Sequence, residues 1–419
     1  MATSEEIQSS TVTRPSDSAD GKTTILFDKT FNVDPSHPEY VPELVDAILA
    51  SASDHGASDV HLVPSENALE MSWRLNGVLQ TVASFPNALK ANIVARLKVL
   101  AELLTYRTDV PQEGRISADV DDVETRVSTF PTLFGEKAVI RLFVGSGDFR
   151  NLDNLQLPPG TAAELREGLV ESGGVILITG PAGSGKTTTA YACLREIVAS
   201  TISRSVVTLE DPVEAVVEGA AQSQVKPSAG FDYETGLKSL LRQDPEVMLV
   251  GEIRDAATAR LVFQMALTGH LVLTTFHAGS ASEAVARLLD MGIEPYQLRS
   301  GILGVLNQRL CRVLCSCAVD SRDSDGKLGL PVDRFREPTG CELCGGTGFQ
   351  GRRPLVEMLT VNDRQTATAI LSRSDSAEIE KSAIEAGMRT RWDRACEAVE
   401  SGNTSPSEVR RVLGFRPSA

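Results

Sequence analysis

The residues with the clearest chemical meaning form a glycine-rich turn between an apolar strand and a helix. Val175–Thr179 is almost wholly apolar, and the residues from Ala190 onward are apolar at helical spacing. The turn between them consists of Gly180, Pro181, Ala182, Gly183, Ser184, Gly185, Lys186, Thr187 and Thr188. Its glycines let successive N–H groups point at phosphate oxygens, Lys186 would reach the β- and γ-phosphates, and the Thr187 hydroxyl would hold Mg²⁺. The sequence therefore predicts a site for ATP and Mg²⁺, although a glycine turn in an unrelated α/β protein is the simpler alternative.

Polar residues also follow three other predicted strands of this region. The runs Ser205–Leu209, Val247–Val250 and Leu271–Thr275 alternate with helical segments, which predicts a buried parallel sheet. Ligands gather at the carboxyl ends of such strands. The candidate side chains at these ends are Glu210, Asp211, Glu214, Glu252 and His277.

Hydrolysis of a triphosphate requires a metal that neutralises charge and a group that orients water. Glu252 directly follows the strand Val247–Val250, as the residue after a Walker B strand does, so it could hold Mg²⁺ through water or polarise the attacking water. Glu210, Asp211 and Glu214 form a second acidic group that could do the same work, although Glu210 and Asp211 could instead merely cap the following helix. His277, at a strand end, is a better candidate for sensing the γ-phosphate than a histidine that precedes the strand.

Composition places the chain among soluble globular proteins. It has 419 residues, 42% of them hydrophobic and 23% charged, which suggests two or three domains. The net charge of −15 argues against direct binding of nucleic acid. No apolar run is long enough to span a membrane, and the first residues lack the features of a signal peptide. Five of the seven cysteines cluster like metal ligands of a reducing compartment, so we expect a cytoplasmic protein.

The pattern along the chain predicts six segments. An amphipathic helix and alternating strands, with an Asn76-Gly77 hairpin turn, indicate a small α+β domain before the phosphate-binding region. The segments are a flexible tail at 1–36, the α+β domain at 37–148, a linker at 149–160, an α/β nucleotide-binding core at 161–310, a cysteine-rich subdomain at 311–355 and a C-terminal helical subdomain at 356–419.

Three stretches resemble the motifs of one family. Thr208–Glu214 resembles an aspartate box, Leu240–Asp255 a Walker B region, and Thr268–His277 a histidine box. Together with the phosphate-binding loop they stand in family order and spacing. The chain from about residue 40 to 414 thus resembles the ATPases of type II secretion and type IV pilus assembly, in a short form that lacks the large N-terminal domain of many members.

The resemblance implies a fold, an assembly and a mode of action. It implies a homo-hexamer of RecA-like ATPase domains, each preceded by a small PAS-like α+β domain that docks on the neighbouring subunit. Arg115 and Arg126 match the family's arginines that complete a neighbour's nucleotide site, although solvated strand arginines are the alternative. It also implies an enzyme at the inner membrane, bound there peripherally through the platform proteins that it drives.

The cysteines resemble the zinc site of the assembly-type branch, with one departure. Cys341 and Cys344, followed by two glycines, are typical of a zinc knuckle. The resemblance pairs them with Cys315 and Cys317, which here have one residue between them instead of two. Cys311, one helical turn earlier, could replace Cys317 as a ligand, and loss of the metal is a further alternative.

Other functions fit single features of the chain. A phosphotransferase acting on a small molecule could use the same loop, but the acidic residues and histidines favour hydrolysis. A DNA translocase is disfavoured by the negative charge, and a scaffold that scarcely hydrolyses would not need the acidic groups. Within the family, a pilus retraction or DNA-uptake motor is the alternative to secretion or pilus assembly. Retraction motors lack the four-cysteine site, which favours assembly or secretion.

Overall fold

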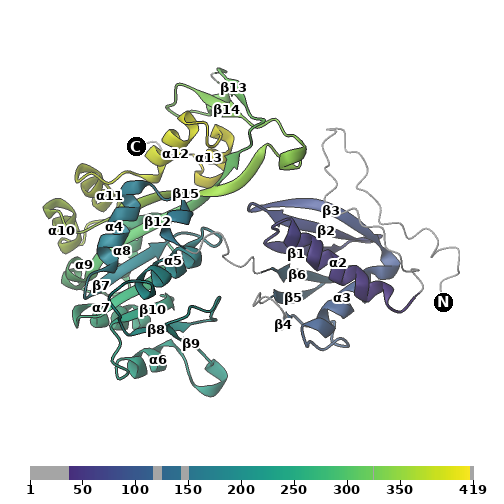
Figure 1. Cartoon of the computed structure of the whole chain (residues 1–419), viewed down its shortest axis with the longest axis horizontal. Helices are drawn as coiled ribbons and strands as arrows, with labels where there is room; N and C mark the ends of the chain where they lie inside the picture. Colours follow the sequence, from purple (N-terminus) through teal and green to yellow (C-terminus); the bar gives the residue numbers. More distant parts are fainter. Residues whose placement is uncertain (1–36, 117–124, 143–150, 324, 416–419) are drawn as a thin grey trace. The chain divides into compact units, whose positions relative to one another are not determined.

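The computed structural model describes residues 37–116, 125–142, 151–323 and 325–415 (Figure 1). The predicted tail at 1–36 and the first two residues of the predicted linker lie outside these ranges. The chain divides into two compact units, and the first boundary between them falls between residues 145 and 146. No helix among the described residues has the length and apolar character that a membrane crossing requires.

The N-terminal unit is a six-stranded antiparallel sheet with two helices. Its strands have the order β3-β2-β1-β6-β5-β4. Their bounds are β1 Asp59–Pro64, β2 Ala68–Leu75, β3 Val78–Pro86, β4 Gln112–Ile116, β5 Thr125–Thr132 and β6 Gly135–Arg141, with helices α2 Tyr40–Asp54 and α3 Asn87–Leu100.

Alternation of residue type along these strands determines which face of the sheet is buried. In β2, Leu69, Met71 and Trp73 are buried and pack in one core with residues of α2 and α3, while the residues between them face outward. The predicted hairpin turn at Asn76-Gly77 is confirmed, because both residues have positive φ angles of 50° and 81°. The helices therefore leave the opposite face of the sheet open within this unit.

The larger unit is a seven-stranded sheet with helices on both faces. Its order is β15-β12-β7-β11-β10-β8-β9, and all neighbouring strands are parallel except β15, which is antiparallel to β12. The strands are β7 Gly174–Thr179, β8 Val206–Glu210, β9 Ala221–Gln224, β10 Val247–Glu252, β11 Leu271–Phe276, β12 Ile302–Leu314 and β15 Phe349–Leu359, with a separate ribbon of β13 Val319–Ser321 and β14 Phe335–Glu337.

The helices of this unit are capped mainly by short polar side chains. They are α4 Pro159–Leu169, α5 Lys186–Val198, α6 Tyr233–Leu240, α7 Ala256–Leu267, α8 Ala281–Asp290, α9 Pro295–Gly301, α10 Arg364–Leu371, α11 Ser376–Glu385, α12 Arg391–Glu400 and α13 Pro406–Leu413. At seven of them, such as α7 after Asp255 and α13 after Ser405, the side chain of the residue before the helix accepts a hydrogen bond from the N–H three residues later. The predicted helix start at Ser405 is thereby confirmed.

The central strands bury both of their faces. In β7, Val175 and Leu177 enter a core with α7, α8 and α9, whereas Ile176 and Ile178 enter a second core with α4 and α5. This two-sided burial explains why the strand reads as a continuous apolar run. The predicted parallel sheet is confirmed.

The long strands β12 and β15 were not anticipated from the sequence. Both contain charged and polar residues among the apolar ones, so neither resembles the apolar runs of the central strands. They cross the positions where the sequence places the ends of the cysteine-rich subdomain, at 311 and 355. The other predicted domain bounds stay predictions.

Candidate nucleotide site

The phosphate-binding loop joins β7 to α5 through three glycines with positive φ angles. Gly180, Gly183 and Gly185 have φ of 145°, 73° and 86°, in the region that residues with a side chain rarely adopt. At Gly180 a Cβ atom would also collide with the Gln308 carbonyl oxygen and the Ser184 hydroxyl. The loop therefore requires glycine for its conformation and for its close approach to β12.

Lys186 begins α5 and is the charged residue of the loop. The residue is 9% exposed, and its Nζ donates to the carbonyl oxygens of Gly180 at 3.1 Å and Pro181 at 2.9 Å. Burial lowers the pKa of Lys186, and the nearby Glu252 carboxylate opposes that shift. Thr187, the predicted Mg²⁺ ligand, follows in the first turn and is exposed.

Glu252 stands at the end of β10 among groups of opposite charge. Its Oε1 accepts a hydrogen bond from Arg254 Nε at 2.6 Å, and its Oε2 lies 3.6 Å from His277 Nε2. Arg254 also donates to Asp211 Oδ2 at 2.9 Å, so Asp211 belongs to this charged group and is not a helix cap. The carboxylates at the ends of β8 and β10 are thus linked through one guanidinium.

The segment Thr208–Glu214, which resembles an aspartate box, is here called the acidic box. Its two glutamates differ in their surroundings. Glu210 is buried, and its carboxylate accepts hydrogen bonds from Tyr191, Thr208 and Gln222. Glu214 is half-buried, and its backbone N–H donates to the Tyr191 hydroxyl at 3.0 Å. Tyr191 of α5 therefore ties the acidic box to the helix that begins with the phosphate-binding loop.

The two histidines of the histidine box lie at opposite ends of β11. His270 precedes the strand, and its ring lies 3.0 Å from the Met265 carbonyl oxygen at the end of α7. His277 follows the strand beside Glu252, with Lys186 close enough to affect its titration. Burial and the Lys186 charge lower the pKa of His277, so its ring is neutral at neutral pH.

The predicted arginines of the N-terminal unit lie side by side on its open face. Arg115 of β4 is opposite Arg126 of β5, and Arg126 is opposite Arg141 of β6. Asp59 continues the row on β1 and pairs with Arg141 at 3.1 Å and with Arg74 of β2 at 3.3 Å. This face is therefore rich in guanidinium groups in a chain whose net charge is negative.

Residues 35–411 match the family model described as "Type II/IV secretion system protein". The chain belongs to this family.

Curated relatives agree with that assignment. The chain is 40% identical to the type II secretion system ATPase E of Vibrio cholerae, over 88% of this chain and 75% of the relative. It is 36% identical to the type IV pilus assembly ATPase PilB of Thermus thermophilus, over 88% of this chain but only 43% of that protein. The family recognised in the sequence motifs is confirmed.

Solved structures support the fold. The ATPase DotB of Legionella pneumophila has a TM-score of 0.65 at 20% identity, covering 90% of this chain and 96% of that one. The pilus retraction motor PilT with bound ADP has a TM-score of 0.54 at 22% identity, covering 87% and 98%. The predicted α/β fold of the RecA-like ATPases is confirmed.

In this family member, four cysteines approach one another closely enough to hold a metal ion. The Sγ atoms of Cys315, Cys317, Cys341 and Cys344 all lie within 4.8 Å of one another. Cys341 and Cys344 are 3.8 Å apart, which is about the separation that a tetrahedral zinc ion with 2.3 Å bonds imposes on two sulfurs. Backbone N–H groups of Cys341 and Gly348 point at the Cys344 sulfur, as suits a thiolate. The predicted set of four fits a metal.

Cys311 lies outside this set. It is fully buried within β12, and its thiol is directed at the Arg353 carbonyl oxygen at 3.6 Å. Burial raises the pKa of Cys311 to about 11, so the thiolate that a metal requires is disfavoured. The arrangement favours Cys317 over Cys311 as the fourth ligand.

Sequence patterns missed the part that β12 plays at the nucleotide site. Gln308 donates to the Ser184 carbonyl oxygen at 2.7 Å and accepts from Thr189 at 3.0 Å, so it holds the phosphate-binding loop and the first turn of α5. Its neighbours Asn307 and Arg309 reach the segment after His277. The available signal was a run of three successive polar residues, Asn307 to Arg309, directly after a mainly apolar stretch.

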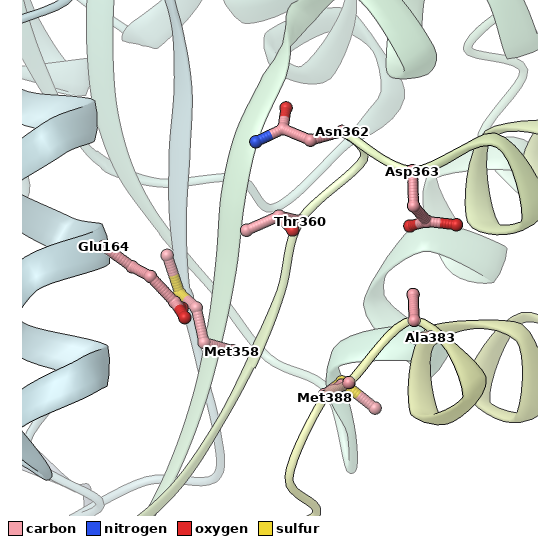
Figure 2. A pocket seen from close by; sticks show the side chains of 9 residues that line it. Glu164, Met358, Thr360, Asn362, Asp363, Ala383 and Met388 are labelled. Carbon is pink, nitrogen blue, oxygen red and sulfur yellow. The ribbon is translucent and has the colours of Figure 1, made fainter.

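A pocket of about 330 Å³ lies elsewhere in the larger unit. Figure 2 shows Glu164 of α4 beside Met358 at the end of β15, with Asp363 at the start of α10 and Ala383 near the end of α11 across the pocket. Its lining residues are Glu164, Met358, Thr360, Asn362, Asp363, Ala383, Ala386, Gly387 and Met388. None of them belongs to the phosphate-binding loop or the acidic and histidine boxes, so the pocket is separate from the candidate chemistry.

Proposed function

We propose that this chain is an ATP-hydrolysing motor that powers type II protein secretion or type IV pilus assembly through an inner-membrane platform. The observation that carries the proposal is the meeting of Lys186, Glu252 and His277 at the ends of three neighbouring strands. Triphosphate hydrolysis needs these three kinds of group: a cation on the phosphates, a carboxylate for water and a neutral donor or acceptor beside the γ-phosphate.

Each side chain has a distinct role in the proposed site. Lys186 binds the β- and γ-phosphates, together with the N–H groups of the loop and the start of α5. Mg²⁺, held by Thr187 and through water by Glu252, neutralises charge on the phosphate oxygens when it is bound. The Glu252 carboxylate orients the attacking water, and neutral His277 hydrogen-bonds to the γ-phosphate or to that water. Glu214 is a second candidate for contact with the water, because Glu210 is already engaged by three donors.

We infer that the site is completed by a second copy of the chain in a homo-hexamer. The open sheet face with Arg115, Arg126 and Arg141 supports this, because such a concentration of guanidinium groups suits an anionic partner. Developing charge on a transferring phosphate is one such partner, and the acidic box around the neighbour's nucleotide is another. Opening and closing of the units around nucleotide then supplies the motion that drives the platform.

We further propose that the four-cysteine site binds zinc. Four thiolates in tetrahedral reach, with N–H groups aimed at one of them, are the donor set that a structural zinc ion prefers. The site also favours secretion or pilus assembly over retraction, since the family's retraction motors lack it. We expect no direct contact with nucleic acid, and we expect a cytoplasmic protein that reaches the membrane only through its partners.

Phosphate release by the purified chain tests the enzymatic part of the proposal. The wild-type protein should release inorganic phosphate from ATP without an added acceptor. Glu252→Gln should still bind a fluorescent ATP analogue but lose at least about 100-fold in kcat, and Lys186→Ala should lose binding. Glu234→Gln, an exposed glutamate of α6 that pairs with Lys238, is the matched control and should keep full activity. Full turnover by Glu252→Gln would refute the role assigned to this carboxylate.

Replacement of the chromosomal copy tests the cellular part. Cells that carry Glu252→Gln should assemble the membrane platform but fail to export its substrates or to extend pili. Normal export and pilus assembly in those cells, with the variant present at wild-type level, would exclude both proposed machines.

A further inference from the structure

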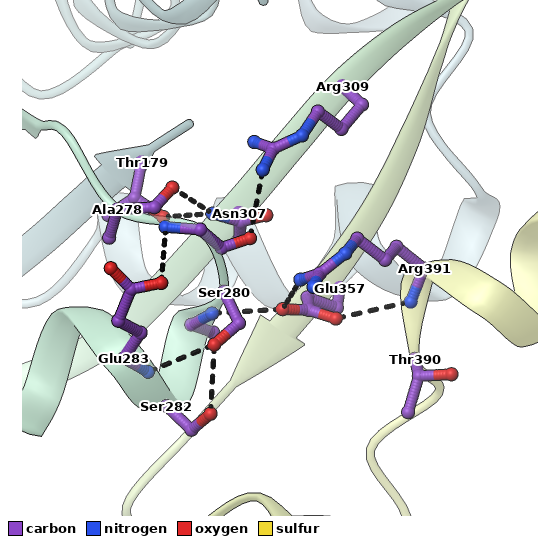
Figure 3. A network of polar contacts seen from close by, with 12 residues as sticks. Thr179, Ala278, Ser280, Ser282, Glu283, Asn307, Arg309, Glu357, Thr390 and Arg391 are labelled. Atoms are coloured by element: carbon purple, nitrogen blue, oxygen red, sulfur yellow. Dashed lines mark hydrogen bonds and ion pairs between the residues drawn. The ribbon is translucent and has the colours of Figure 1, made fainter. Parts of the chain in front are cut away.

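The segment that follows β11, His277–Ala281, is here called the histidine loop. Side chains from other parts of the chain hold its backbone at almost every peptide (Figure 3). Arg287 donates to the carbonyl oxygen of His277, and Glu283 accepts from the N–H of Gly279 at 2.8 Å. At the far end, the buried Glu357 carboxylate accepts from the N–H of Ala281 at 2.9 Å and pairs with Arg391 at 2.8 Å. The position of the histidine loop is therefore imposed by its surroundings.

Strand β12 supplies the contacts at the near end of the loop, beside His277. Asn307 donates to the Ala278 carbonyl oxygen at 3.2 Å, and Arg309 donates to the Gly279 carbonyl oxygen at 3.0 Å. Asn307 is also directly opposite Thr179, the last residue of β7 before the phosphate-binding loop, and donates to its hydroxyl at 2.9 Å. A single amide group thus joins the start of the phosphate-binding loop to the start of the histidine loop.

The two partners of Asn307 show that only its donor capacity is used. The Thr179 hydroxyl already donates to the Leu306 carbonyl oxygen, so it must accept from Asn307, and a carbonyl oxygen such as that of Ala278 can only accept. The amide nitrogen therefore faces both groups. The Oδ1 atom of Asn307 is buried and has no hydrogen-bond partner among the described residues. Such a group is costly to bury, which indicates that both donated bonds matter.

We propose that Asn307 is a positioning residue for hydrolysis, which fixes His277 relative to the phosphate-binding loop. His277 follows β11 and Lys186 follows β7, and their separation sets where a γ-phosphate can meet the histidine ring. Asn307 locks that separation, because it bonds Thr179, directly before the phosphate-binding loop, and Ala278, directly after His277. Gln308, the next residue, holds the phosphate-binding loop independently through Ser184. Loss of the Asn307 bonds therefore disturbs turnover and leaves nucleotide binding nearly intact. The inference rests on the proposed ATPase function.

The variant Asn307→Asp tests this proposal through a dependence on pH. It preserves the shape of the side chain but replaces the NH2 group, which donates to Thr179 and Ala278, with a carboxylate oxygen that can only accept. At pH 8 we expect kcat to fall at least about tenfold, with the dissociation constant for a fluorescent ATP analogue changed less than about twofold. At lower pH the aspartate protonates and regains one O–H donor. The ratio of variant to wild-type kcat should therefore rise as the pH falls from 8 to 6.

Two results would overturn the proposal. One is a kcat equal to that of wild type at pH 8, and the other is a parallel loss of kcat and of nucleotide binding with no recovery at low pH, which a purely structural role would produce. Asn362→Asp, an exposed asparagine of the separate pocket, is the matched control and should change neither quantity. Wild-type protein is measured in the same assay, so that the two claims can fail separately. A wild-type protein that does not hydrolyse ATP would refute the proposed function, whereas an active wild type matched by Asn307→Asp would refute only the role of Asn307.

A second variant keeps the test decisive if Asn307→Asp does not fold. Thr179→Val is nearly isosteric and removes the hydroxyl that accepts from Asn307, and it introduces no charge. It should lower kcat in the same direction, by about threefold to tenfold, with nucleotide affinity retained. Unchanged kcat in a folded Thr179→Val protein would contradict the proposed link.

Discussion

At the scale of single residues, the pKa of His277 offers a direct test of the electrostatics of the site. Burial and the Lys186 charge lower the pKa of its ring, whereas the Glu252 carboxylate raises it. We expect His277 to titrate below the ordinary value of about 6.5. Lys186→Met should then raise the pKa of His277, because a positive charge is removed, and Glu252→Gln should lower it further. A site whose chemistry needs the neutral ring consequently keeps its activity as pH falls to about 6.5.

Histidine NMR titration measures both shifts in the intact chain. The chain has five histidines, and a His277→Gln variant assigns the relevant signal by its loss. His61, in the N-terminal unit, provides an internal control, because its pKa, which burial and the Arg74 charge lower, should be the same in all variants. Shifts of the same sign in Lys186→Met and Glu252→Gln would contradict the arrangement described for the two charges.

Sequence patterns located the residues of the site that follow central strands. Lys186, Glu252 and His277 could be predicted because an apolar run identifies a strand and its end identifies the catalytic edge. Asn307 and Tyr191 could not, because their significance depends on which strand or helix lies beside the phosphate-binding loop. Pairing between β12 and β7 joins residues about 130 positions apart, and no local pattern encodes it. The role of Glu210 was similarly hidden, since sequence does not distinguish a buried carboxylate from a solvent-facing one.

At the scale of elements, helix α13 is attached to β12 through one buried carboxylate. The side chain of Glu408 has no exposed surface, and it accepts hydrogen bonds from Arg312 of β12 and from Arg411. Burial alone would raise the pKa of Glu408, but the hydrogen bonds from both arginines outweigh it and hold the pKa below the ordinary range. The folded state thus favours the ionised form.

Glu408→Gln should therefore destabilise the larger unit at neutral pH. We expect a loss of about 3 kcal/mol, because two guanidinium groups lose their counter-charge, which lowers the unfolding temperature by roughly 6–12 °C. The difference from wild type should persist above about pH 4.5 and shrink as pH falls through the lowered pKa of Glu408, where the carboxylate becomes protonated. Calorimetry at several pH values measures it.

Glu397→Gln is the control for this experiment. Glu397 also pairs with two arginines, Arg389 and Arg394, but its side chain is 46% exposed, so its loss should cost less than about 1 kcal/mol. Equal effects of the two substitutions would show that burial of Glu408 does not determine its contribution.

The cysteine-rich segment allows a second prediction at this scale. Purified wild-type protein should contain about one zinc ion per chain by elemental analysis. Cys317→Ser should lose most of that metal, because it removes one of four ligands, and its unfolding temperature should fall by several degrees. Cys311→Ser should keep the metal, since Cys311 lies outside the set of four. Loss of zinc from Cys311→Ser, with retention in Cys317→Ser, would reverse the assignment.

Elements with a regular pattern were predictable, and those with mixed composition were not. The helices in the range 376–414 follow from their hydrophobic period, and the four central strands follow from their continuous apolar runs. Strands β12 and β15 were not predicted because neither has a regular hydrophobic pattern. β12 pairs with β7 only as far as Asn307, and beyond that residue buried and partly exposed positions do not alternate regularly and charged residues occur among them. Their antiparallel pairing depends on contact between residues 35 to 54 positions apart, from Leu314 with Phe349 to Val305 with Leu359.

At the scale of the whole molecule, mixed oligomers test whether arginines act on a neighbouring subunit. Arg126→Ala and Glu252→Gln should each abolish hydrolysis alone, because every site then lacks one essential group. In a one-to-one mixture reassembled at random, about one quarter of the interfaces combine an intact Glu252 with an intact Arg126. Phosphate release should therefore recover to at most about a quarter of the wild-type rate.

An arginine that acts within its own chain gives a different result. Neither variant would then contain a complete site, and the mixture would stay inactive. Arg107→Ala, an exposed arginine of the same unit paired with Asp109, should be fully active alone and in mixtures. Sequence alone could indicate this assembly only by resemblance, since contacts between copies leave no periodic pattern in one chain.

Strand β12 imposes a condition on anyone who recombines members of this family. One continuous strand carries Asn307 and Gln308 beside the nucleotide loop. Cys315 directly follows the end of this strand, about eight positions after Asn307 and roughly 26 Å further along an extended chain. A crossover placed between these positions would join a nucleotide-site half from one parent to a cysteine-rich half from another, with mismatched partners on β15 and α13. Functional chimeras should therefore inherit residues 302–413, which include β12, β15 and α13, as a block.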